Sequence, residues 1–324
     1  MEARRLFALG ALALFFVVTV IMVQAARGPL EPEARIRRFD RLWMIALTRA
    51  GPERIVSAGE RGRIVYSGDG ATSWKVASTP TYQTLTSLFF ADPRTGFATG
   101  HQGTLLRTDD GGASWSALPL EGREKPALFA VRVEGERGIA VGAYGAYYES
   151  GDGGHAWAPR RIVAGDFDRH FTGIAPCGAG CLVIAGEAGT LLRSQDAGAT
   201  WQLVKSPYEG SYFGAVGVPG GAVVVYGMRG NAYRSSDGGA SWQRIDLGRY
   251  TGTLLGASLQ PDGSVVLTGS DGFVATSRDG GTTFDVAWVA GRLTVSGLVI
   301  VGQRVLCAGP TGLRWADKLA LAAP

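Results

Sequence analysis

The chain has 324 residues, with 46% hydrophobic and 19% charged residues, 49 glycines and a formal net charge of +4. This composition suits a globular protein with frequent turns and half-buried strands. The sequence pI is about 9.0, but no Lys/Arg cluster exceeds three residues, which excludes the basic stripe with interleaved aromatic residues that nucleic-acid binding requires.

Residues 1–26 have the features of an export segment. Arg4 and Arg5 precede an uncharged, mostly apolar run of 18 residues from Leu6 to Val23. A cleaved signal peptide has a shorter apolar run, whereas 18 residues suffice to span a bilayer. We therefore expect a signal peptide or, in preference, an uncleaved anchor at residues 6–23 in the inner membrane, with the rest of the chain on the periplasmic or equivalent exported side. Residues 27–33 are the expected tether.

From residue 34 the chain is organised by a repeated Gly-x-x-Gly tetrad. The first glycines of successive tetrads are 41, 42, 44, 41, 42 and 40 residues apart. A turn that recurs at this spacing indicates one supersecondary unit copied seven times, and we expect the glycines to adopt positive φ in these turns. The seven tetrads are 59–62, 100–103, 142–145, 186–189, 227–230, 269–272 and 309–312.

A second marker follows the first six tetrads at a fixed distance. It has the form Ser/Thr-x-Asp-x-Gly-x-Ser/Thr-Trp and resembles the Asp-box, or bacterial neuraminidase repeat. We expect each carboxylate to accept backbone N–H groups within its turn and each aromatic ring to fill the space between adjacent sheets, which favours a structural over a catalytic role. The pairs are Asp69 and Trp74, Asp110 and Trp115, Asp152 and Trp157, Asp196 and Trp201, Asp237 and Trp242, and Asp279 and Phe284.

Short apolar runs between these markers predict four strands per repeat. In the second copy they are Leu85–Phe90, Gly96–Thr99, Thr104–Thr108 and Trp115–Leu118. Four antiparallel strands at this period predict an all-β, seven-bladed β-propeller over residues 34–318, followed by a C-terminal tail at 319–324. The seventh copy supplies only three strands, so we expect Ala34–Phe39 to close the ring as its fourth strand.

The three cysteines indicate no metal site. Cys177 and Cys181 bracket a hairpin turn and are either joined in a disulfide or two unpaired thiols, whereas Cys307 lies in an apolar strand and is expected to be buried. The spacing provides no second Cys pair and no nearby His pair, and no cofactor is predicted.

Strand order brings the tetrads and the blade-to-blade connections to one face and the aspartate markers to the other. The first face collects Arg and Tyr residues, which are enriched at protein interfaces. The residues that we expect to bind a partner are Arg61, His101, Tyr144, Arg169, Tyr208, Tyr212, Arg229 and Tyr250.

An enzyme is the alternative. A glycosidase needs two carboxylates on either side of the scissile bond, and Glu187 and Asp271 are candidates on the same face. Sialidases, however, have six blades and a Phe/Tyr-Arg-Ile-Pro stretch near the start. Residues 35–38, Arg-Ile-Arg-Arg, depart from that pattern.

The stretch from Leu85 to Trp115 resembles a blade of the photosystem II stability/assembly factor family, and the similarity extends over residues 34–316. The resemblance implies a seven-bladed propeller without known catalysis that serves as an assembly platform for membrane proteins on the non-cytoplasmic side. Relatives occur in bacteria without photosynthesis. The hypothesis is a non-enzymatic envelope scaffold whose tetrad-bearing face binds a membrane-protein client or an envelope complex. The alternative is a sialidase-like glycoside hydrolase or a carbohydrate-binding propeller.

Overall fold

The computed structural model describes residues 42–316 and 319–321. The predicted export segment, the tether and the predicted closing strand Ala34–Phe39 lie outside the described residues. Within the described residues, none of the helices has the length and apolar character needed to cross a bilayer.

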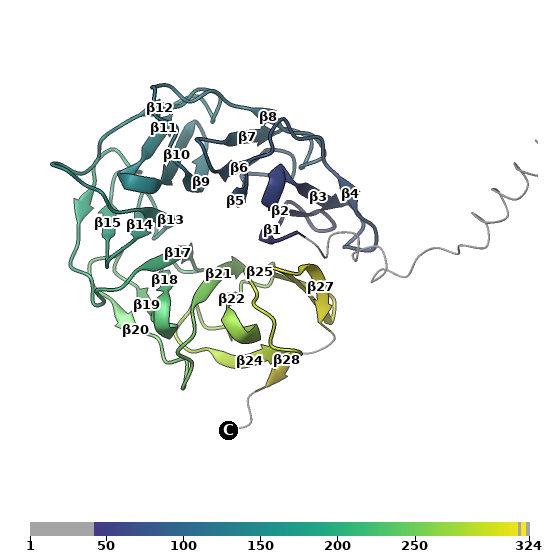
Figure 1. Ribbon diagram of the computed structural model, residues 1–324. Helices are drawn as coiled ribbons and strands as arrows, with labels where there is room; N and C mark the ends of the chain where they lie inside the picture. Colours follow the sequence, from purple (N-terminus) through teal and green to yellow (C-terminus); the bar gives the residue numbers. More distant parts are fainter. Residues whose placement is uncertain (1–41, 317–318, 322–324) are drawn as a thin grey trace, which may run out of the picture.

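The described chain forms seven antiparallel sheets arranged as a ring, with the first strand of each sheet nearest the centre (Figure 1). The predicted all-β, seven-bladed propeller is therefore confirmed. Blades 1 to 3 contain β1 Met44–Arg49, β2 Ile55–Gly59, β3 Ile64–Ser67 and β4 Lys75–Val76; β5 Leu85–Phe90, β6 Gly96–Gly100, β7 Leu105–Thr108 and β8 Ser116–Ala117; and β9 Leu128–Glu134, β10 Arg137–Gly142, β11 Tyr147–Ser150 and β12 Ala158–Pro159.

Blades 4 to 7 repeat this order. They contain β13 Phe171–Pro176, β14 Leu182–Gly186, β15 Leu191–Ser194 and β16 Gln202–Leu203; β17 Tyr212–Gly217, β18 Val223–Gly227, β19 Ala232–Ser235 and β20 Gln243–Arg244; β21 Leu254–Leu259, β22 Val265–Gly269, β23 Phe273–Ser277, β24 Asp285–Val289 and β28 Leu319–Leu321; and β25 Gly297–Val301, β26 Arg304–Gly309 and β27 Gly312–Ala316. Single 3-10 turns lie at η2 Glu60–Gly62, η3 Ala143–Gly145, η4 Met228–Gly230 and η5 Ser270–Gly272.

The last two blades depart from the four-stranded pattern. The sequence placed residues 319–324 in a tail, whereas Leu319–Leu321 forms β28 and pairs antiparallel with β24 of blade 6. β24 has five residues, compared with two in the fourth strands of blades 1 to 5, so it offers a longer edge for backbone pairing. Blade 7 has three strands among the described residues.

The core consists of seven apolar clusters, one between each pair of adjacent blades. The second strands of blades 1, 2, 4, 5 and 6 are buried along their whole length, as in β18 with its sequence Val-Val-Val-Tyr-Gly, because both faces of each sheet pack on a neighbour. In β10 and β26 only the first residue, an arginine, is half-buried. The cluster between blades 7 and 1 contains Met44 and Leu306, and the Ser296 hydroxyl donates to the Met44 carbonyl at 2.9 Å. Side-chain packing therefore closes the ring within the described residues.

The two glycines of a tetrad have different roles, which corrects the expectation that both adopt positive φ. The fourth residue does so, as in Gly62 (φ 64°), but Gly59 is extended (φ −173°). Gly59 is required by close approach: a Cβ there would lie 2.0 Å from the carbonyl oxygen of Trp43, which precedes β1. The sequence could not reveal this contact because it joins Gly59 at the end of β2 to a residue that precedes β1.

Replacing Trp115 by alanine tests the inter-blade packing. The ring is 5% exposed and lies in the cluster between blades 1 and 2, so Trp115→Ala should lower the free energy of unfolding by about 3–5 kcal/mol. Denaturant unfolding measures the change, with Ser116→Ala, at an exposed position, as the control. A loss for Trp115→Ala as small as that of the control would contradict the packing role.

Candidate functional site

The tetrads and the blade-to-blade connections occupy one end of the ring, which we name the tetrad face. They are joined by backbone hydrogen bonds: the N–H of Gly145 donates to the carbonyl of Arg169 at 2.8 Å, and the N–H of Gly189 donates to the carbonyl of Gly210 at 2.9 Å. The aspartate turns, which join the third and fourth strands, lie at the opposite end, which we name the aspartate-turn face. The sequence predicted this division.

The third residue of each of the first six tetrads has a left-handed backbone. The φ values lie between 49° and 57°, although none of these residues is glycine. For an L-residue this conformation costs about 1–2 kcal/mol, and here the hydrogen bonds around each turn maintain it. The turn thereby presents six exposed side chains around the ring: Arg61, Gln102, Tyr144, Ala188, Arg229 and Asp271.

Tyr144 belongs to a cluster that bridges blades 3 and 4. Its backbone N–H donates to Nδ1 of His170 at 3.2 Å, and the two rings meet edge to face with centroids 4.8 Å apart. The backbone N–H of His170 donates to the Glu187 carboxylate at 3.3 Å, and His170 also lies 6.0 Å from the ring of Phe129. The Tyr144 side chain is 71% exposed above this support.

The structure places the eight predicted partner-binding residues in three environments. Arg61, His101, Tyr144, Arg169 and Arg229 are exposed on the tetrad face. Tyr208 and Tyr250 are half-buried; Tyr250 stacks on Phe273, and its hydroxyl donates to the carbonyl of Thr253 at 2.9 Å.

Tyr212 differs from the other seven. It is fully buried in the cluster between blades 4 and 5, where its ring contacts Tyr208 and Tyr233, so it cannot contact a partner. The sequence placed it in a connection, whereas it is the first residue of β17 and points into the core.

Sequence reasoning missed two exposed apolar residues of the tetrad face. Trp43 directly precedes β1 and is 40% exposed, and Leu293 lies between β24 and β25 and is 41% exposed. A large apolar side chain in a polar connection was the signal that could have identified them.

On the opposite face the aspartate side chains are saturated with hydrogen bonds. Asp196 accepts the Thr200 hydroxyl at 2.6 Å, the Thr200 backbone N–H at 2.8 Å and the Ser194 hydroxyl at 2.7 Å. These hydrogen bonds lower the pKa of Asp196 to about 2, and the bond from the Thr200 hydroxyl contributes most. Hydrogen bonds also lower the pKa at Asp152, Asp237 and Asp279. At Asp69 and Asp110 burial raises the pKa, but the combined hydrogen bonds outweigh it and the pKa is again lowered. A carboxylate held ionised in this way does not act as a general acid near neutral pH.

The aromatic residues that end these turns fill the gaps between sheets. The Trp115 indole N–H donates to the Gly112 carbonyl at 3.1 Å, and the Trp157 ring meets Phe97 of blade 2 edge to face. Trp115 and Trp157 are buried, whereas Trp74, Trp201, Trp242 and Phe284 are half-buried.

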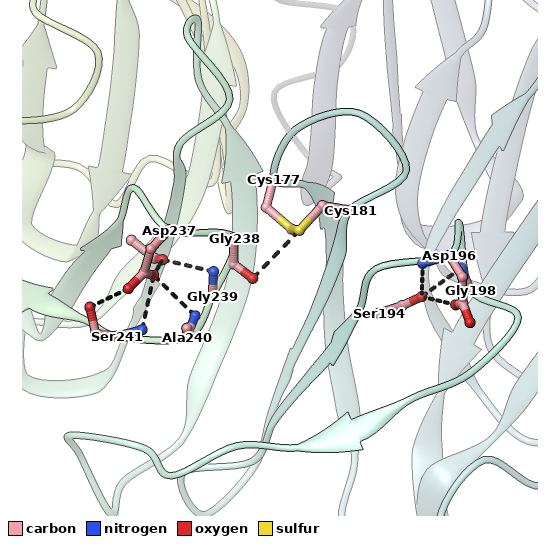
Figure 2. Close-up of a disulfide and its surroundings, with 11 residues drawn as sticks. Cys177, Cys181, Ser194, Asp196, Gly198, Asp237, Gly238, Gly239, Ala240 and Ser241 are labelled. Atoms are coloured by element: carbon pink, nitrogen blue, oxygen red, sulfur yellow. Dashed lines mark hydrogen bonds between the residues drawn. A yellow bond between two sulfur atoms is a disulfide. The ribbon is translucent and has the colours of Figure 1, made fainter.

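Cys177 and Cys181 form a disulfide across the hairpin between β13 and β14 (Figure 2). Sγ of Cys181 lies 3.5 Å from the Gly238 carbonyl oxygen in the aspartate turn of blade 5. Cys307 is buried in β26, and burial raises the pKa of its thiol to about 12. In the part of the chain that the structure describes, no three His, Cys, Asp or Glu side chains are grouped to hold a metal ion.

These features define a β-propeller with aspartate turns whose tetrad face displays exposed aromatic and arginine side chains. The family described as photosynthesis system II assembly factor YCF48 matches residues 66–138 and 127–285, which together cover more than half of the chain. The chain belongs to this family. No curated protein sequence matches it.

Similar solved structures share the fold. A structure described as YCF48 bound to D1 peptide is 16% identical, with a TM-score of 0.66 over 88% of this chain and 93% of that one. YCF48 from Cyanidioschyzon merolae is 15% identical, with a TM-score of 0.64 over 86% of this chain and 95% of that one. An ancestral GH74 enzyme is 12% identical, with a TM-score of 0.69 over 86% of this chain and 45% of its own. At these identities the likeness concerns the fold alone.

The aspartate turns predict that the protein loses stability in acid. Because the folded pKa of Asp196 and of Asp237 is about 2, against 3.8 ordinarily, the ionised carboxylates stabilise the fold fully above pH 4. That stabilisation disappears as the pH falls through 2. Denaturant midpoints should therefore decrease steadily between pH 4 and pH 2, and the decrease should be smaller in Asp196→Asn/Asp237→Asn. Equal acid sensitivity of the two proteins would contradict this role.

Proposed function

We propose that this chain is a non-enzymatic scaffold that binds a membrane-protein client or an envelope complex through its tetrad face. The observation that carries the proposal is the location of exposed apolar side chains. Of the nine large hydrophobic residues that are exposed in the described chain, five lie on this face: Trp43, Tyr82, Tyr144, Met228 and Leu293. Tyr82 belongs to the connection between β4 and β5, and Met228 to the tetrad 227–230. Aromatic residues, methionine and arginine are enriched at the centres of protein interfaces.

Charge on the same face supports a protein partner. Arg61 and Arg229 project from left-handed turns, and Arg169 lies beside the Tyr144 and His170 cluster. Arginine can make bidentate hydrogen bonds to carboxylates while its planar head stacks on aromatic rings. Such a surface suits a partner with exposed acidic and aromatic groups.

The path of the chain supports an orientation toward a membrane. The carbonyl of Trp43 accepts the Glu60 N–H of the first tetrad at 3.0 Å, so the chain enters β1 from the tetrad face. An anchor at residues 6–23 would keep this face turned toward the inner membrane from the periplasmic side. Residues 27–41 can reach about 50 Å when extended, which leaves room for a client between the face and the bilayer.

The alternative is a sialidase-like hydrolase or a carbohydrate-binding propeller. Glu187, one of the two carboxylates suggested for it, already accepts the backbone N–H of His170, which is a structural use of that oxygen. The other, Asp271, occupies one of the left-handed turns. These positions favour a binding surface over a pair of catalytic carboxylates.

Affinity purification of the full chain from crosslinked membranes tests the proposal. A variant with Arg61, Arg169 and Arg229 replaced by alanine should recover its membrane-protein client at least tenfold less well than the unaltered chain. The matched control carries alanine at Arg94, Arg244 and Arg278, which removes the same charge away from the tetrad face. Equal client recovery by both variants would contradict the proposal, and so would cleavage of aryl glycosides or sialosides that is lost in Glu187→Gln/Asp271→Asn.

A further inference from the structure

Blades 3 and 4 differ in the hairpin that joins their first two strands. In blade 3 only Gly135 and Glu136 separate β9 from β10, whereas in blade 4 five residues, 177–181, separate β13 from β14. The longer hairpin therefore stands beside a shorter neighbour on the aspartate-turn face. A cavity of about 280 Å³ lies between them, which we name the blade 3–4 pocket.

The lining of the blade 3–4 pocket combines an apolar wall with charged groups. Ile139, Pro176 and Leu182 supply apolar surface, and Ile139 and Leu182 are themselves buried. Blade 3 adds Arg132, Arg137 and Glu134, so the lining contains two cationic side chains and one anionic side chain. Small-ligand sites are mostly apolar with a few polar groups that fix orientation, and this pocket has that arrangement.

Two of the three charged groups, Arg132 and Glu134, are paired with each other. Nη2 of Arg132 donates to the Glu134 carboxylate at 2.9 Å, and the guanidinium lies 5.8 Å from the ring centroid of Phe89 in blade 2. Glu134 neutralises the positive charge of Arg132, so the pocket keeps the single positive charge of Arg137. A single carboxylate complements that charge better than a dianion does.

The hairpin wall is fixed before any ligand arrives. The disulfide joins its two ends, the N–H of Cys177 donates to the Cys181 carbonyl at 3.0 Å, and the N–H of Ala197 donates to the Gly180 carbonyl at 2.7 Å. Figure 2 shows the disulfide between the aspartate turns of blades 4 and 5, with Sγ of Cys181 facing Gly238. A preformed wall lowers the entropy cost of binding.

We propose that the blade 3–4 pocket binds a small aliphatic monocarboxylate. The hydrocarbon body would lie on Ile139 and Leu182, and the carboxylate would accept hydrogen bonds from Arg132 and Arg137. The volume falls just below the range that drug-sized ligands occupy, which suits a short-chain acid or the terminal residue of a peptide. The site is on the face opposite the tetrad face, so it does not depend on the proposed function.

Calorimetric titration of the full chain, with its disulfide intact, tests this site. Hexanoate represents a free acid and N-acetyl-leucine represents the C-terminal residue of a peptide. We expect at least one of them to bind saturably, and the probe with the lower Kd shows whether the pocket takes a free acid or a chain terminus. The corresponding neutral amide should bind at least tenfold more weakly. No saturable binding of either acid, or equal affinity for acid and amide, would overturn the proposal.

Three variants place the ligand in the blade 3–4 pocket. Ala179→Trp fills the mouth of the pocket from an exposed hairpin position and should abolish binding. Arg132→Gln/Arg137→Gln should weaken binding of the acid at least tenfold and leave binding of the amide unchanged. Arg278→Gln, on the same face in blade 6, should change neither affinity.

Circular dichroism melting confirms that each variant is folded. If the double variant is not folded, Arg137→Gln alone should weaken binding of the acid several-fold. Acid binding that survives both Ala179→Trp and the arginine change would overturn the assignment. Client recovery through the tetrad face should be unaffected by Ala179→Trp, so the two proposals can fail separately.

Discussion

The close approach of a backbone carbonyl to the first glycine of each tetrad is the constraint on which the tetrad face depends. In the first six blades, the residue before the innermost strand places its carbonyl oxygen where a Cβ would lie, at 2.0–2.5 Å. The same oxygen accepts the N–H of the second tetrad residue, as in Ala127 with Ala143 at 2.8 Å. A side chain at that glycine would separate the entering chain from the turn. The contact therefore fixes the direction in which the left-handed third residue projects.

Packing between blades makes these separate turns into one surface. Because the seven apolar clusters lie between sheets, each blade is stable only with neighbours on both sides. Hydroxyl groups on the innermost strands add polar links, such as Thr172 to the carbonyl of Tyr212 at 2.9 Å. The exposed residues of different blades thus keep constant relative positions, which is what a binding surface assembled from many loops requires.

The periodic features could be predicted from the sequence, and the features that break the period could not. The blade count, the strand at Leu85–Phe90 and the two faces follow from the spacing of glycine and aspartate turns. The pairing of β28 with β24 could not be foreseen, because it depends on the length of an outer edge in another blade. The burial of Tyr212 was missed because a shift of one residue separates a connection from the first residue of a strand. The blade 3–4 pocket depends on the difference in length between two hairpins, and no single repeat shows it.

The central claim is that the tetrad face, and not the aspartate-turn face, meets the client. The most direct measurement places a photo-crosslinking amino acid at exposed positions of the full chain in cells, at Arg61 and Gln102 on one face and at Gln195 and Ser236 on the other. Irradiation should join the first two positions to the same membrane protein and leave the second two without that product. Crosslinks to that membrane protein from Gln195 and Ser236, with none from Arg61 and Gln102, would contradict the account.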